Sequence, residues 1–128
     1  MKNSILIIDD DSRNIFALSA VLRSKGYRTL SAPSAQEGII LMKREKGVSV
    51  VFLDMMMPEM DGYQALGILK EDPELAQVPV FAVTAQAMVG DRERCLEAGA
   101  DEYIPKPIDV DLLLGLLKAH KVGSEHEG

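Results

Sequence analysis

The chain has 128 residues, of which 47% are hydrophobic and 27% are charged, and this length and composition predict a single globular domain. Its net charge of −6, without any basic run, argues against direct contact with nucleic acid, whose phosphates require cationic partners. No apolar run approaches the ~20 residues of a membrane span and no signal-peptide pattern opens the chain, so we expect no membrane span and a cytoplasmic location.

Strand-like and helix-like segments alternate along the first third of the sequence. The apolar run 5–8 predicts a buried strand, and three aspartates follow it. A helix is predicted next, with Ser12 as its cap and Gly26 at its C-terminal end. A weaker strand at 28–32 precedes a second helix, which Ser34 caps and which extends to about residue 45.

The stretch VSVVFLDMMMPEMDG, residues 48–62, lies at the centre of the pattern. Five of its first six residues are apolar, which is typical of a strand that is buried on both faces. That strand ends on a carboxylate, Asp54. The turn-forming pair Asp61-Gly62 then predicts the start of a helix that runs to about Glu71 and ends before Pro73.

The second half of the chain repeats the alternation. An apolar strand at 78–83 ends on Thr84, and a helix is predicted from Met88 or Asp91 to Ala98, with Gly99 as its cap. After these come a short strand at 101–104, a rigid turn at 105–107, and a helix that Asp109 caps and that ends near His120. We expect residues 1–122 to form the domain and residues 123–128 to be a disordered tail or a cloning remnant.

Strict alternation with short loops predicts a doubly wound α/β fold, in which five parallel strands carry helices on both faces. The first, third and fourth strands are solidly apolar and are therefore central, whereas the second and fifth are short or polar and are therefore edges. The predicted strand order is 2-1-3-4-5, as in flavodoxin-like (βα)5 proteins.

Sulfur and imidazole groups offer little chemistry of their own in this sequence. The lone Cys95 excludes an internal disulfide and a cysteine metal site, and we interpret it as a buried, inert thiol. Both histidines, His120 and His126, lie in the last nine residues. We therefore expect the folded body to carry no imidazole, so that any histidine chemistry comes from a partner.

Several reactive side chains follow the predicted strands at the point where each strand ends. Because the carboxyl ends of parallel strands meet at one edge, this edge should collect Asp9, Asp10, Asp54, Thr84 and Lys106. Three clustered carboxylates call for a hard cation, and Mg²⁺ fits because it binds few carboxylates and recruits phosphate oxygens. A metal, an ammonium and a hydroxyl around one carboxylate indicate a phosphoryl-transfer site with that carboxylate as nucleophile.

The motifs ILIIDDD at residue 5, VFLDMMMPEMDG at 51, VTAQA at 83 and YIPKP at 103 resemble the receiver domain of two-component response regulators over residues 3–120. The resemblance implies that Asp54 accepts a phosphoryl group from a phosphohistidine on a histidine kinase or a histidine phosphotransfer protein, in a Mg²⁺-dependent phosphorelay that switches a partner-binding surface. It also implies a signalling module that is not an enzyme, beyond its own phosphorylation and dephosphorylation.

The resemblance further implies individual roles at the site. Asp10 would bind Mg²⁺ directly, with Asp54 and the Met56 backbone carbonyl as further ligands, while Asp9 would hold the waters of the metal. Lys106 would pair with the phosphoryl oxygens, and its bond to Pro107 would be cis.

Two further pairs of residues complete the resemblance. Thr84 and Tyr103 match the switch pair, and Met56 and Gln86 occupy the positions that tune the lifetime of the phosphoryl group. The stretch SRNIFAL at Ser12 is most similar to receivers that are attached to hybrid histidine kinases, and a free-standing response regulator is the alternative.

Three other classes of protein share parts of this pattern. A dehalogenase-like phosphatase needs an acid two residues after the nucleophile, where this chain has Met56, and it usually carries a cap insertion. A flavodoxin-like cofactor binder needs a Gly/Ser/Thr-rich loop after the first strand, whereas residues 9–11 would repel phosphate. A degenerate receiver that binds partners without phosphorylation is the third class. No site residue is missing here, so the sequence does not favour it, and only an experiment excludes it.

Overall fold

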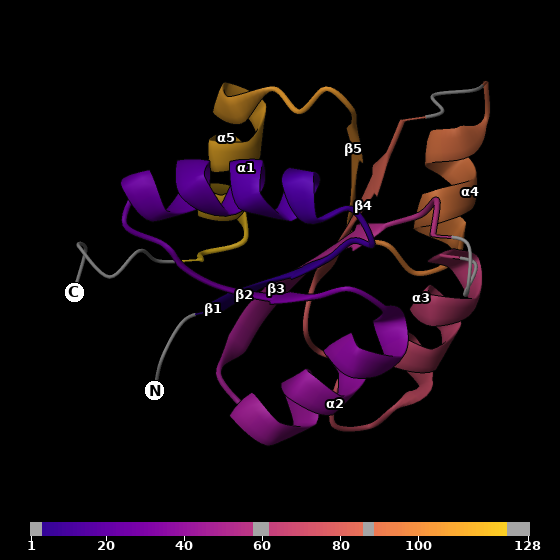
Figure 1. Ribbon diagram of the computed structural model, residues 1–128. Coiled ribbons are helices and arrows are strands. Elements are labelled where there is room, and N and C mark those ends of the chain that lie inside the picture. Colours follow the sequence, from indigo (N-terminus) through magenta and orange to yellow (C-terminus); the bar gives the residue numbers. More distant parts are fainter. Residues whose placement is uncertain (1–3, 58–61, 86–88, 123–128) are drawn as a thin grey trace.

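The computed structural model describes residues 4–57, 62–85 and 89–122, and in this part of the chain five parallel strands form one sheet in the order β2-β1-β3-β4-β5 (Figure 1). This is the predicted topology. The elements are β1 (Ser4–Ile8), α1 (Ser12–Ser24), β2 (Arg28–Ala32), α2 (Ala35–Glu45), β3 (Val48–Asp54), α3 (Gly62–Glu71), β4 (Val80–Thr84), α4 (Asp91–Glu97), β5 (Glu102–Pro105) and α5 (Val110–Ala119).

The side chains of the central strands alternate between two apolar cores, one on each face of the sheet. On β1, Leu6 and Ile8 belong to the core beneath α2, α3 and α4, whereas Ile5 and Ile7 belong to the core beneath α1 and α5. Figure 1 shows α1 and α5 together on one side of the sheet. The buried Cys95 of α4 packs in the first core, as predicted. In the described ranges, no helix combines the length and the apolar character that crossing a bilayer requires.

Several predicted boundaries shift by one or two residues, and local hydrogen bonds explain three of these shifts. Asp11, not Ser12, caps α1, since its carboxylate accepts the Arg13 N–H at 2.9 Å. β4 begins at Val80 rather than at residue 78, because the Val78 N–H bonds within a turn to Leu75. Similarly, β5 begins after Asp101, whose carboxylate accepts the Val80 N–H at 2.7 Å.

The expectation that the folded body lacks imidazole is wrong for His120. This residue is the C-cap of α5. Its ring packs edge-on against the Phe81 ring, with 5.0 Å between the ring centroids, and its Nε2 lies 2.9 Å from the Glu102 carboxylate. Glu102 opens β5, so this contact lies at the amino edge of the sheet, away from the acidic residues. His126 and the predicted tail lie outside the described residues, as does Met88, and α4 begins at the alternative start, Asp91.

The entry into α3 fits closely against the residue that follows Asp54. A Cβ added at Gly62 would lie 2.7 Å from the Met55 Cα and 2.6 Å from the Met55 sulfur. We therefore expect Gly62→Ala to destabilise the fold by about 1–3 kcal/mol through overpacking. Gly67→Ala is the matched control, since a Cβ there meets nothing within 4 Å on the same helix. Urea unfolding of both variants is the measurement, and equal stabilities would contradict the expectation.

Candidate functional site

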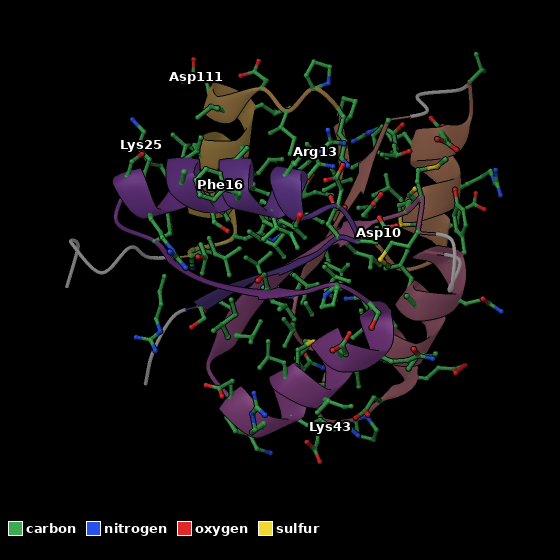
Figure 2. All side chains as sticks on the ribbon, viewed as in Figure 1. Asp10, Arg13, Phe16, Lys25, Lys43 and Asp111 are labelled. Carbon is green, nitrogen blue, oxygen red and sulfur yellow. The ribbon has the colours of Figure 1, made fainter. Side chains whose placement is uncertain are left out.

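The carboxyl edge of the sheet brings the predicted residues together. β1 and β3 are neighbours with Ile8 paired to Leu53, so Asp9 and Asp54 come next on adjacent strands. β4 ends at Thr84, which pairs with Pro105 of β5, and Lys106 follows directly. Figure 2 labels Asp10 at this edge, beside the start of α1. The parallel register alone therefore places four strand ends around one site.

Three carboxylates form the centre of this site. Asp9, Asp10 and Asp54 each contribute an oxygen, and these oxygens lie within 4.8 Å of one another. Asp54 is only 6% exposed and Asp9 only 5%, while Asp10 is open to solvent. Burial raises the pKa of the Asp54 carboxyl, and the negative charge of Asp9 raises it further, whereas the Met56 N–H and the Lys106 charge oppose the change.

Lys106 supplies the positive charge that faces these acids. Its Nζ lies 3.3 Å from Asp9 Oδ2, and its side chain is 22% exposed. The backbone holds the lysine in place, because its N–H donates to the Thr84 carbonyl at 2.8 Å. The Lys106-Pro107 peptide bond is cis, as the resemblance implied.

The Asp9 carboxylate accepts hydrogen bonds from three donors in the described part of the chain, and one of them comes from a residue outside the predicted site. Its Oδ1 accepts the backbone N–H of Asp11 at 2.9 Å, and its Oδ2 accepts the side-chain amide of Asn14 at 3.3 Å as well as the lysine. Asn14 was not among the predicted site residues. The available signal was its position in the first turn of α1, on the helix that begins directly after the aspartates.

The predicted switch and lifetime residues differ in how the structure places them. Thr84 is buried and lies at the site, whereas Tyr103 pairs with Ala82, is half-buried, and packs against the core that contains Cys95. Burial, reinforced by the nearby Asp91, raises the pKa of Tyr103. Met56 is 46% exposed beside Asp54, and its N–H donates to Asp54 Oδ1 at 2.9 Å. Gln86 lies outside the described residues.

A cavity of about 540 Å³ lies between α1 and the sheet and reaches the acids. Its polar end is formed by Asp9, Asn14, Asp54 and Lys106, and its walls are mainly apolar, with Leu18, Val21, Phe52, Val83 and Ile108 among the lining residues. The Asp54 carboxylate is therefore bordered on one side by apolar surface, where charges interact more strongly than in water.

The chemistry of the donor set fits a small, hard divalent cation. Carboxylate oxygens are the ligands that Mg²⁺ prefers, and one open and two buried carboxylates leave room for water and phosphate oxygens. The charge of Lys106, whose Nζ lies 3.3 Å from Asp9, offsets only part of the charge of the three carboxylates, so the cluster keeps an excess of negative charge. The fold and the site together define a doubly wound α/β protein with an acidic site at the carboxyl edge of its sheet, and the carboxylates of this site fit a divalent cation.

The sequence matches the response regulator receiver domain over residues 5–118, and the chain belongs to this family of two-component signalling proteins. This membership decides against the phosphatase and the cofactor-binding interpretations. The chain is similar to the polar-differentiation response regulator DivK of Brucella ovis, with 35% identity over 120 residues that cover 94% of this chain and 97% of that protein.

Solved structures agree with this assignment. The receiver domain of the sensor histidine kinase PA1611 from Pseudomonas aeruginosa PAO1, described with a magnesium ion coordinated in its active site cleft, is 31% identical with a TM-score of 0.81, covering 93% of this chain and 97% of that one. A CheY-like receiver domain protein from Methanospirillum hungatei JF-1 is 29% identical with a TM-score of 0.82, and both chains are covered completely.

Proposed function

We propose that this receiver domain accepts a phosphoryl group on Asp54 from a phosphohistidine of a histidine kinase or a histidine phosphotransfer protein. A carboxylate oxygen of Asp54 attacks phosphorus while the bond from phosphorus to the imidazole nitrogen breaks, and the imidazole leaves with the electron pair. The supporting observation is the buried carboxylate of Asp54 between two further acids and Lys106. The module modifies only itself and acts in the cytoplasm.

Mg²⁺ would be bound directly by Asp10, Asp54 and the Met56 backbone carbonyl. Asp9 would bind the water molecules that the metal carries. When bound, the cation neutralises charge on the phosphoryl oxygens. Lys106 binds those oxygens from the other side, since its ammonium lies at the site and its backbone is anchored to β4. The donor chemistry of the three clustered acids and the magnesium of the Pseudomonas receiver support this assignment.

Incubation with acetyl phosphate and Mg²⁺ tests the proposal without requiring the partner kinase. Intact-mass spectrometry should show the addition of one phosphoryl group, and reduction with borohydride followed by peptide mapping should place it at Asp54. Excess chelator should prevent the labelling. A label on another residue, or equal labelling in chelator, would refute the proposed site or its dependence on the metal, and no label at all would favour a receiver that works without phosphorylation.

We further propose that Thr84 and Tyr103 transmit the modification to the surface around α4, β5 and α5. Thr84 lies at the site end of β4, so its hydroxyl can move toward a phosphoryl oxygen. Tyr103 is half-buried on the neighbouring strand and has an amphipathic ring that tolerates both environments. Amide NMR spectra with beryllofluoride should therefore change along β5 and α4, and changes confined to the acids would contradict this coupling.

Met56 is expected to shield the phosphoryl group from water. Its side chain is 46% exposed beside Asp54 and offers water no strong hydrogen bond. Met56→Asn should speed hydrolysis by about tenfold, since a positioned polar group contributes that much or more to water attack. The measurement is the decay of phosphorylated protein after removal of the donor. Ile68→Asn is the control, being similarly exposed at 42% on α3, and decay of Met56→Asn at the wild-type rate would contradict the shield.

A further inference from the structure

The side chain of Asn14 makes a contact that phosphoryl transfer on Asp54 does not by itself require. Its amide lies 3.3 Å from Asp9 Oδ2, and Lys106 Nζ lies 3.3 Å from the same oxygen. Because a carboxylate only accepts hydrogen bonds, the amide nitrogen must be the group that faces it. Two donors from distant parts of the chain, one neutral and one charged, therefore share one acceptor oxygen.

A phosphoryl group on Asp54 changes the balance between these two donors. It brings anionic oxygens close to Lys106, whose ammonium is then drawn from Asp9 toward the larger negative charge. The amide of Asn14 is neutral, so it has no comparable reason to leave. Without it, Asp9 would keep, among the donors that the described residues give it, only the backbone N–H of Asp11, and a carboxylate that is 5% exposed would lose both side-chain donors.

We propose, on the basis of the function proposed above, that Asn14 is a positioning residue for phosphoryl transfer: its amide holds Asp9 in place and frees Lys106 to turn to the phosphoryl group. The helix fixes this amide, since α1 begins two residues earlier and Asp11 caps it through the Arg13 N–H at 2.9 Å. A lysine or an arginine at this position would follow the phosphoryl charge itself. A neutral amide is therefore suited to remain bound to Asp9 when the lysine turns to the phosphoryl group.

A double-mutant cycle with Lys106 tests this role. Asn14→Ala should slow labelling by acetyl phosphate about tenfold, because departure of Lys106 then leaves Asp9 without a side-chain donor. In a Lys106→Ala background, Asp9 lacks the lysine both before and after transfer, so its dependence on Asn14 is the same in both states. Adding Asn14→Ala to this variant should therefore slow labelling by less than about twofold. Gln36→Ala, which removes an exposed amide from the first turn of α2, is the control and should label at the wild-type rate.

A second readout does not depend on labelling. Calorimetric titration with MgCl₂ should show weaker binding to Asn14→Ala than to wild type or Gln36→Ala, because Asp9 is less well held. Unchanged labelling of Asn14→Ala, unchanged Mg²⁺ affinity, or a full tenfold loss in the Lys106→Ala background would each overturn the proposal. If wild type itself is not labelled at Asp54, the proposed function fails, whereas a labelled wild type with an equally fast Asn14→Ala refutes the role of Asn14 alone.

Discussion

Replacing Asp54 with asparagine is expected to abolish phosphoryl transfer, with a loss of more than about 10³-fold. An amide does not attack phosphorus, yet its oxygen can still accept the Met56 N–H that now bonds to Asp54 Oδ1 at 2.9 Å. The fold should therefore persist while the nucleophile is lost. Asp109→Asn is the matched control, since it removes the same charge and asparagine also caps a helix. Intact-mass spectrometry after incubation with acetyl phosphate is the measurement, and a labelled Asp54→Asn protein would contradict the assignment.

The same substitution should raise stability when no metal is bound. Burial and the neighbouring Asp9 raise the pKa of Asp54 in the folded state, so between the ordinary and the raised pKa the folded protein binds more protons than the unfolded chain. Wild-type stability therefore falls as the pH rises through that interval, and Asp54→Asn lacks this loss. At neutral pH in chelator its Tm should be higher by about 2–6 °C, because the variant avoids the cost of burying this charge and the repulsion from Asp9. A Tm that is no higher would contradict the pKa argument.

Lys106→Ala is expected to slow phosphoryl transfer by about 10²–10³-fold, because the site loses the fixed cation that stabilises charge on the phosphoryl oxygens. It should also reduce metal-free stability by about 1–3 kcal/mol, since the buried Asp9 carboxylate loses a charged partner at 3.3 Å. Both effects arise from one ammonium facing clustered acids. Rates of labelling and urea unfolding in chelator measure them separately.

Lys70→Ala provides a matched control for this lysine. Lys70 is 23% exposed and pairs with Asp101 at 2.9 Å, whereas Lys106 is 22% exposed and pairs with Asp9. Removing Lys70 should lower stability without slowing labelling, because Asp101 precedes β5 and lies away from the acidic edge. Equal labelling rates for the two variants would show that the charge of Lys106 is not used in the reaction.

Much of this molecule is determined by local patterns that the sequence displays directly. The apolar runs at β1, β3 and β4 can only be buried, and their alternation with amphipathic helices leaves a parallel sheet as the arrangement that satisfies them. Parallel strands all end at one edge of the sheet. The residues at or just after the strand ends therefore lie close together, and these include Asp9, Asp54 and Lys106. The gathering of the site therefore follows from strand periodicity and chain order.

The partners of individual side chains were decided only by the tertiary structure. The sequence did not indicate that Asn14 shares Asp9 with Lys106, or that His120 packs on Phe81 and bonds to Glu102 at the opposite edge. Such contacts depend on how far each helix is rotated and displaced over the sheet. That placement results from the packing of many side chains at once, and no local pattern in the chain encodes it.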